Sequence, residues 1–358
     1  MPKLLSIFAF FIISVFILSG CKPPDLEGAL LHVKNERWDE ALVLAEKVTK
    51  EHPENSEGWY TLGYIYGKKD RIDDMISAYD KCMSIDNTHN QNIEAEKYDY
   101  YAKKFNNGAA KYNEYLKQDD PLSEDAIAIM KESIQSFEQA NTLNPNFRAV
   151  ALAAQGYSQI NEKDEAEKMF KSLIETYPDS SSAWVNLGRY YYNNKDYNEA
   201  IPNLKKATEL DSSTAEPYIL LAQSYDFLDK KEEAVPYYKT AVLLKEDDSA
   251  VSFNLGLLFY KLAIATSDEE KKNKNFENAI EYFDLSLQYN ADFMSSYQLK
   301  GNAELLLKRY DEAKETLETG TEKFPEDYQM WNDLAICYAL LNEADLAKEA
   351  EARAEALK

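Results

Sequence analysis

The feature that most constrains the fold of this chain is a pattern that recurs every 34 residues. In residues 181–214 two short amphipathic segments follow each other, and the second contains Ala200. Ala166 precedes Ala200 by 34 positions, Ala234 follows it by 34, and a large apolar or aromatic residue comes four positions after each alanine. Self-similarity at a period of about 20–50 residues is typical of repeat arrays, in which each unit packs on its neighbours. We therefore expect one tandem array, although 358 residues would otherwise suggest two or three domains.

The unit of residues 181–214 resembles the tetratricopeptide repeat (TPR). That family has the pattern Trp-x2-Leu-Gly-x2-Tyr, followed by Ala, a large apolar residue, a second Ala and often Pro. The unit matches it at Trp184, Leu187, Gly188, Tyr191, Ala200, Leu204 and Ala207, with Ser212 where Pro is usual. The resemblance implies an all-α fold, a right-handed superhelical solenoid of helix-turn-helix repeats. Because small residues let helices approach closely and large ones fill the remaining space, we expect these residues to form the core.

About nine such units cover nearly all of the chain after residue 25. They are expected at residues 22–55, 56–89, 92–146, 147–180, 181–214, 215–248, 249–293, 294–327 and 328–358. The third unit contains a long helix over residues 92–117, and the seventh contains a charged segment, residues 266–275, that we expect to be an exposed loop. Insertions at one point of two repeats often mark the binding side of an array. Neutral loop growth at small entropic cost is the alternative.

The N-terminus has the layout of a secretory signal. Lys3 precedes an apolar run over residues 4–18 that is short for a membrane-spanning helix. Leu18, Ser19, Gly20 and Cys21 resemble the lipobox of bacterial lipoproteins, which implies cleavage before Cys21 and lipidation of its thiol. Residues 1–20 are thus predicted to be a signal peptide, and residues 21–24 the lipidated cysteine and a short tether to a solenoid over residues 25–358. An ordinary signal peptide or an uncleaved anchor is the alternative.

A lipidated Cys21 would attach the protein to a membrane of the cell envelope. No Asp follows Cys21 directly, which resembles the signal for an outer-membrane destination in Gram-negative sorting. We expect the periplasmic face of the outer membrane, with the inner membrane or the cell surface as alternatives.

The net charge of −23 counts against nucleic-acid binding, because phosphate contacts need a basic stripe. The charge serves solubility, or it makes an acidic groove that recruits a basic partner, and both interpretations stay open.

The residues that could carry chemistry do not form a recognisable catalytic or metal-binding set. His32, His52 and His89 lack the spacing of a zinc site. Cys82 and Cys337 fall at core positions of distant units, so we expect buried free thiols. The sequence also has no Gly-rich phosphate loop and no nucleophile elbow. We therefore expect no enzyme activity, no cofactor and no metal ion.

In the TPR family the first helices of successive repeats line a concave groove, and ligand contacts come from positions outside the packing pattern. Carrying these positions over gives a set of aromatic, amide and basic side chains. The set is Tyr60, Tyr64, Gln155, Arg189, Tyr192, Asn193, Gln223, Phe227, Phe253, Asn254, Tyr260, Gln298 and Asn302. Amides can meet a peptide backbone and rings can meet its apolar side chains, so the set suits an extended peptide. Ordinary surface or packing between repeats is the alternative for each residue.

The sequence therefore predicts a membrane-anchored, extracytoplasmic TPR scaffold that binds a protein or peptide partner in its groove. Cell-envelope assembly, pilus biogenesis and secretion are the processes expected for such a scaffold. The alternative is a surface lipoprotein that binds glycans or other nutrients, because Tyr and Trp rings can stack on sugars.

Overall fold

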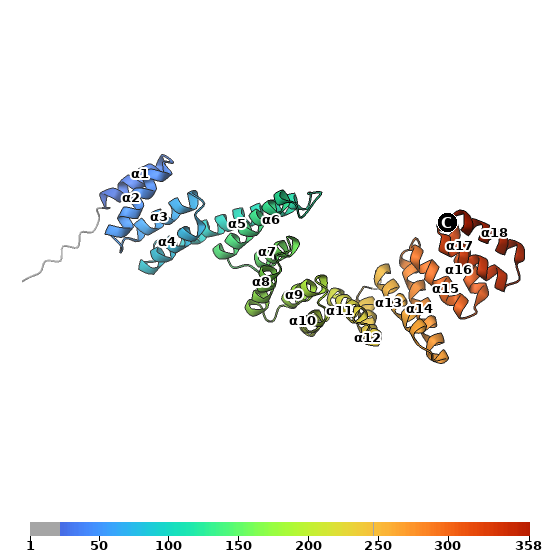
Figure 1. Cartoon of the computed structure of the whole chain (residues 1–358). Helices are drawn as coiled ribbons and strands as arrows, with labels where there is room; N and C mark the ends of the chain where they lie inside the picture. Colours follow the sequence, from blue (N-terminus) through green and yellow to red (C-terminus); the bar gives the residue numbers. More distant parts are fainter. Residues whose placement is uncertain (1–21, 246) are drawn as a thin grey trace, which may run out of the picture. The chain divides into compact units, whose positions relative to one another are not determined.

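The computed structural model describes residues 22–245 and 247–358, so Cys21 and the predicted signal peptide lie outside the described residues. The described residues form eighteen α-helices and no strand, in nine successive helix pairs (Figure 1). This all-helical architecture confirms the predicted fold class. The chain divides into two compact units, with Ile160 the last residue of unit 1 and Asn161 the first of unit 2.

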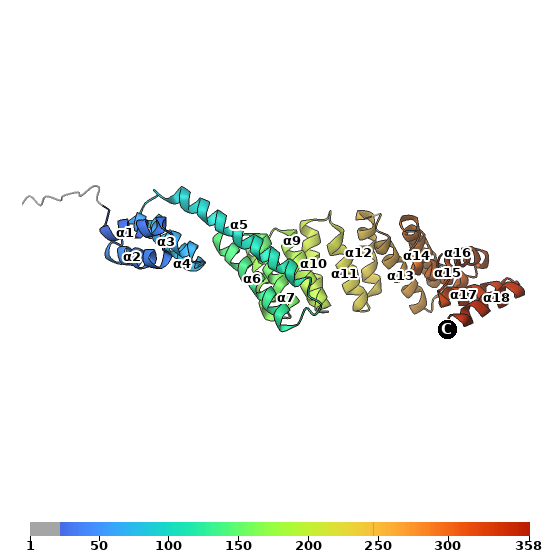
Figure 2. The same cartoon turned by 90° about the horizontal axis from the view of Figure 1, so that it is seen from above.

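Unit 1 contains seven helices. They are α1 (Pro24–Lys34), α2 (Trp38–Glu51), α3 (Ser56–Lys68), α4 (Ile72–Ile85), α5 (Asn90–Tyr115), α6 (Glu124–Leu143) and α7 (Phe147–Gln159). The predicted long helix of the third repeat is α5, and it lies beside α6 (Figure 2). The extra residues of this repeat lengthen both helices, to 26 and 20 residues. Ser123 begins α6 as a cap, because its side chain accepts a hydrogen bond from the backbone N–H of Ala126 at 3.3 Å.

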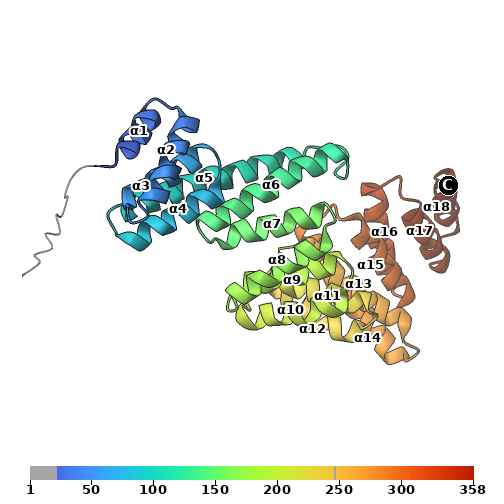
Figure 3. The same ribbon diagram turned by 60° about the vertical axis from the view of Figure 1, so that its left-hand side comes forward.

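Unit 2 contains the remaining eleven helices of the described chain. They are α8 (Lys163–Thr176), α9 (Ser181–Asn193), α10 (Tyr197–Leu210), α11 (Ala215–Phe227), α12 (Lys231–Leu244), α13 (Ser249–Ala265), α14 (Glu269–Tyr289), α15 (Met294–Leu306), α16 (Tyr310–Lys323), α17 (Tyr328–Leu340) and α18 (Ala344–Ala356). In the seventh repeat the insertion again lengthens both helices, α13 to 17 and α14 to 21 residues. Figure 3 shows α14 as the longer member of this pair.

The expected loop over residues 266–275 is wrong for most of its length, because α14 begins at Glu269. The Asp268 side chain accepts hydrogen bonds from the backbone N–H groups of Glu270 and Lys271, at 3.0 and 3.1 Å. Glu269 and Glu270 also place negative charge in the first turn, where the helix dipole favours it. The charged composition that indicated a loop instead provides a helix start on an exposed surface.

The same backbone turn joins the two helices in seven of the nine described pairs. One turn residue has φ between 54° and 65° in each case: Glu36, Asp70, Asn161, Lys195, Asp229, Lys308 and Asn342. Members of this set in adjoining regular repeats are 34 residues apart. The next N–H bonds back to a carbonyl five residues earlier, as from Asp196 to Tyr191 at 2.9 Å. Left-handed backbone at this one position therefore reverses the chain in every repeat without an insertion.

Within a repeat, the two helices meet where a residue without a side chain faces a large one. A Cβ atom on Gly188 of α9 would lie 2.6 Å from Leu204 Cγ of α10, closer than real side chains pack. Gly301 faces Leu317 at the same distance of 2.6 Å, and both leucines are fully buried. The glycine of the repeat pattern thus allows the two helices to pack closely, as expected from the sequence.

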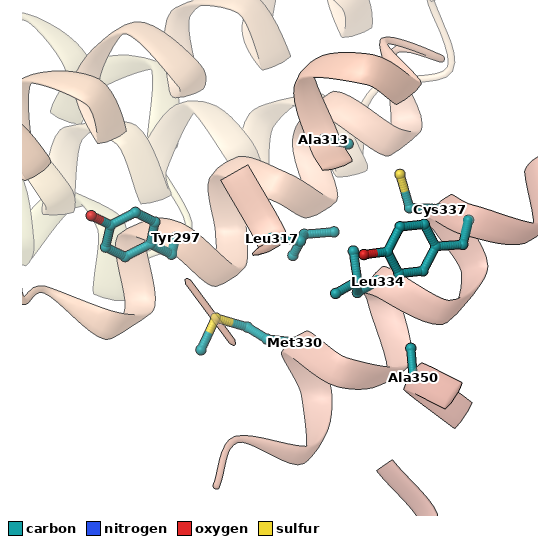
Figure 4. Packing of buried hydrophobic residues seen from close by; sticks show 8 residues of the cluster. Tyr297, Ala313, Leu317, Met330, Leu334, Cys337 and Ala350 are labelled. Atoms are coloured by element: carbon teal, nitrogen blue, oxygen red, sulfur yellow. The ribbon is translucent and has the colours of Figure 1, made fainter. Parts of the chain in front are cut away.

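The apolar core of the last two repeats shows how neighbouring pairs share one interior. Side chains from four helices, α15 to α18, contribute to one buried cluster (Figure 4). Its larger members are Tyr297, Leu317, Met330, Leu334 and Tyr338. Cys337 is buried in the same cluster, and Cys82 is buried in unit 1. Burial raises the pKa of each thiol to about 11, so both cysteines are the buried free thiols that the sequence predicted.

Polar contacts also join neighbouring repeats, and they explain two positions of the motif. The indole N–H of Trp184 donates to the carbonyl of Pro178 at 2.8 Å, and Trp331 makes the same contact with Pro325 at 2.9 Å. Two turns further along the first helix, the Tyr191 hydroxyl donates to Glu167 of α8 at 2.9 Å. In these repeats the bonds fix the first helix against the end of the preceding repeat.

The eighth repeat replaces this apolar and aromatic packing with buried charge. Lys300 and Glu304 of α15 stand where α9 has Leu187 and Tyr191. Lys300 Nζ lies 2.7 Å from Asp284 Oδ1 and 3.7 Å from Glu304 Oε1. Glu304 is only 1% exposed and its Oε2 atom has no hydrogen-bond partner. Burial raises the pKa of Glu304, which means that the protein destabilises its charged form.

Restoring the repeat pattern in α15 should therefore stabilise the protein. We expect Lys300→Leu together with Glu304→Tyr to raise the free energy of unfolding by about 1–3 kcal/mol, because apolar packing often exceeds a buried ion pair in stability. Lys300→Leu alone should lower it by about 3 kcal/mol, since Glu304 would lose its cation. Urea unfolding followed by circular dichroism measures both changes. A double variant less stable than the single one would contradict this account.

Candidate binding face of the first helices

The predicted groove residues of unit 2 lie on the first helices of its repeats, α9, α11, α13 and α15. Between the neighbouring first helices α9 and α11, Arg189 Nε lies 2.8 Å from Glu216 Oε1. The two side chains, with Asn186 and Pro217, line a pocket of about 270 Å³. Arg189 thus has an acidic partner on the next first helix, and a groove between α9 and α11 is open beside it.

Three aromatic rings, two of them half-buried, form a cluster at the C-terminal ends of α9 and α11 and the start of α10, here called the aromatic patch. It consists of Tyr192, Tyr197 and Phe227. The rings of Tyr197 and Phe227 are nearly parallel, with centroids 4.9 Å apart, and Tyr192 lies 5.7 Å from Tyr197. Phe227 is 62% exposed, although it stacks on a neighbour. Of the predicted set, Asn193 is exposed next to Tyr192 and Gln223 is half-buried one turn before Phe227.

Tyr197 was missed by the sequence analysis. It is the first residue of α10, the second helix of its repeat, whereas the family pattern assigns contacts to first helices. The turn after α9 reverses the chain so that this ring contacts both Tyr192 and Phe227. An aromatic residue directly after the left-handed turn is the signal that could have indicated it.

A row of polar side chains crosses α13, α15 and α17. The Tyr260 hydroxyl donates to Asn302 Oδ1 at 2.6 Å. Asp333 of α17 is 4% exposed and accepts a hydrogen bond from Gln329 Nε2 at 2.9 Å. Burial raises the pKa of Asp333, while hydrogen bonds from Gln329 and Asn302 oppose that rise. Tyr260 and Asn302 therefore hold consecutive first helices together.

Two other predicted residues take part in packing between helices. Phe253 of α13 contacts the rings of Phe283 and Phe293, with centroids 5.7 and 4.9 Å apart. In unit 1, Tyr60 stacks on His89 at 4.4 Å and donates to Glu96 at 2.6 Å. These contacts match the packing alternative that the sequence left open, and a role in partner binding stays a prediction for both residues.

The remaining members of the predicted set are half-buried on first helices. Tyr64 lies on α3, Gln155 on α7, Asn254 on α13 and Gln298 on α15. Of these, Tyr64 lines a pocket of unit 1. Their part in partner binding also stays a prediction.

Within residues 22–245 and 247–358, no helix combines the length and the apolar character needed to cross a membrane. The same residues contain no group of three or more His, Cys, Asp or Glu side chains arranged to hold a metal ion. What they do contain is a stack of helix pairs with an exposed aromatic patch and an open groove, the features of a helical repeat scaffold.

Models of the tetratricopeptide repeat match residues 56–89, 149–180, 181–214, 215–248 and 299–358, which together make up more than half of the chain. The chain therefore belongs to the tetratricopeptide repeat family. Members of this family are scaffolds that bind protein or peptide partners and are typically non-catalytic.

Similarity to individual proteins is limited. The chain is 27% identical to human Superkiller complex protein 3 over 150 residues, 41% of this chain and 10% of that protein. It is 24% identical to the mouse protein of that name over 302 residues, 78% of this chain and 19% of that protein. The chain thus spans at most about a fifth of the length of these relatives. Among solved structures, pilF of Pseudomonas aeruginosa has a TM-score of 0.48 at 16% identity, covering 65% of this chain and 96% of that chain.

Stability measurements can separate the candidates that are free to bind from those that pack. We expect Phe227→Ala to change the free energy of unfolding by less than about 1 kcal/mol, because the ring is largely exposed. Phe253→Ala should lower it by about 2–4 kcal/mol, since two other rings lose their contact. Thermal and urea unfolding of the two variants check this difference. Equal losses would show that Phe227 is a packing residue as well.

Proposed function

We propose that this protein is a lipid-anchored, extracytoplasmic scaffold that binds a protein or peptide partner on the first helices of unit 2. The observation that carries the proposal is the aromatic patch. Tyr192, Tyr197 and Phe227 hold their rings within 6.2 Å of one another while Phe227 stays 62% exposed. Contiguous apolar surface that stays exposed is a common feature of interaction sites.

The patch is suited to act as the centre of an interface. Aromatic residues are enriched among the few side chains that dominate binding energy. The three rings already contact each other, so their side chains are ordered before a partner binds. They would therefore lose little further side-chain entropy on binding. Asn193 and Gln223 lie beside the rings and can exchange hydrogen bonds with the backbone of an extended segment.

The location of the protein is proposed from the lipobox at residues 18–21. Only Lys22 and Pro23 separate Cys21 from α1, which begins at Pro24. Two extended residues span roughly 7 Å, so a lipid on Cys21 would hold the first repeat close to the membrane surface. A scaffold held there suits cell-envelope assembly, pilus biogenesis or secretion, and we propose the periplasmic face of the outer membrane as its site.

Site-directed cross-linking in cells tests the binding face. A photo-reactive benzophenone side chain at Asn193 should form an adduct with one defined polypeptide, identified by mass spectrometry. Combining it with Tyr192→Ala and Phe227→Ala should reduce the yield about tenfold, since the loss of roughly 1.4 kcal/mol of binding corresponds to that factor.

The matched control places the same side chain at Glu209, which is exposed at the far end of α10. Equal adducts at Asn193 and Glu209, or a yield that the two alanines leave unchanged, would reject the proposed face. The same experiment bears on the alternative of glycan capture, because a protein that binds only glycans would give no polypeptide adduct at Asn193.

Lipidation has its own test. Cys21→Ser should abolish incorporation of a clickable fatty acid and move the protein from the membrane fraction to the soluble fraction, because acyl chains supply membrane affinity of about 0.8 kcal/mol per buried methylene. Cys82→Ala is the control, since that thiol lies in the core of unit 1. Continued labelling of the Cys21→Ser protein would show that the anchor lies elsewhere.

A further inference from the structure

Unit 1 contains a pocket between α3 and α5, whereas the aromatic patch that carries the proposed function belongs to unit 2. The volume of the pocket is about 350 Å³. Helix α3 contributes Tyr64, Gly67 and Lys68, and helix α5 contributes Glu96, Asp99, Tyr100 and Lys103. Helix α5 is the long helix of the third repeat, and the two carboxylates that it contributes, Glu96 and Asp99, lie in its first half.

The wall of the pocket depends on a close approach between α3 and α5. A Cβ atom on Gly67 would lie 2.8 Å from Cζ and from the hydroxyl oxygen of Tyr100. The ring of Tyr100 therefore lies directly against the backbone of α3. Tyr64 provides a second aromatic surface one turn earlier on α3, and Trp38 supports it with ring centroids 6.3 Å apart.

A carboxylate with ordered partners lies in this pocket. Glu96 Oε1 accepts a hydrogen bond from the Tyr60 hydroxyl at 2.6 Å, and its Oε2 accepts one from the Tyr79 hydroxyl. Burial and the nearby Glu96 charge raise the pKa of both tyrosines, so both remain donors at neutral pH. A carboxylate can accept about four hydrogen bonds, which leaves Glu96 able to accept from a ligand. Asp99, one turn along α5, is an exposed second carboxylate.

The Tyr64 ring already holds a cation. Lys68 Nζ lies 5.0 Å from the centre of the ring, within the range of a cation–π contact. Lys68 comes from the next turn of the same helix and is exposed, so an incoming cation could displace its side chain at small cost. The pocket thus combines an aromatic surface that attracts cations with two carboxylates and two lysines, Lys68 and Lys103.

We propose that this pocket binds an arginine side chain of the protein partner. The guanidinium would lie over the Tyr64 ring in place of Lys68 Nζ and donate to Glu96 and Asp99. A planar guanidinium suits both contacts better than an ammonium, because it stacks on rings and offers a fork of N–H donors. The net charge of −23 favours the approach of a basic segment. That the arginine belongs to a protein partner rests on the proposed function. The pocket would add a contact on unit 1 to the binding face of unit 2.

Binding of defined peptides to the full-length protein in detergent micelles tests whether the pocket prefers arginine. The probes are fluorescein-labelled decapeptides of Gly and Ser with one central arginine, lysine or citrulline, and anisotropy gives the dissociation constants. We expect the arginine peptide to bind about tenfold more tightly than the citrulline peptide, which keeps the shape and loses the charge. The lysine peptide should fall between them. Equal binding of the arginine peptide and either of the others overturns the proposal.

Paired variants locate the site. Asp99→Asn should weaken binding of the arginine peptide about threefold to fivefold, the usual size of an exposed charge contact. Asp80→Asn removes the same charge from an exposed position of α4 and should change binding little. Lys68→Gln should strengthen binding about threefold by removing the internal competitor, whereas Lys81→Gln on α4 should not. If the controls change binding as much as the pocket variants, only net charge matters and the pocket is not the site.

These outcomes are distinguishable from failure of the proposed function. Loss of peptide binding with an intact partner adduct at Asn193 would reject the arginine pocket alone. Peptide binding without any partner adduct at Asn193 would keep the pocket and reject the face on unit 2.

Discussion

The structure depends on one packing contact that recurs along the chain, the approach of a first helix to its second helix at a residue with little or no side chain. At Gly188 no added carbon fits against Leu204, so the backbone of α9 lies directly on the side chains of α10. Dispersion attraction acts only at short range, so this packing needs the small residue on the first helix and the large residue on the second helix together. Neighbouring pairs then share the remaining core, as the cluster of Tyr297, Leu317 and Met330 illustrates.

The third repeat departs from the regular spacing and contributes to the pocket of unit 1, whereas the aromatic patch lies in the regular fifth and sixth repeats. Regular repeats reverse the chain at one left-handed residue, whereas the third and seventh repeats lengthen their helices and lack that turn. Helix α5 contributes Glu96 and Asp99 to this pocket from its first half. The described residues give no structural reason for the buried charge of Glu304.

The predicted binding residues fall into two groups, those that pack against another helix and those that stay largely exposed. Tyr60, Phe253 and Tyr260 occupy positions of the family groove, yet each is engaged by a residue of another helix. Phe227 occupies a comparable position and stays largely exposed, because its stacking partner Tyr197 covers only one side. The position of a side chain on a helix is readable from the sequence. Whether a neighbour fills the space in front of it depends on helix crossing and local insertions.

The sequence by itself determined the class of fold, the pairing of helices and the core positions, because these follow from a spacing of 34 residues and from the alternation of small and large side chains. It also indicated the free thiols of Cys82 and Cys337, which lie at core positions. The helix after Asp268 also has local causes, a capping side chain and acidic residues in the first turn, which the charged composition concealed. Only the tertiary structure decided that Tyr197 completes the aromatic patch and that the Tyr100 ring lies against Gly67. Both result from contacts between segments that no local pattern specifies.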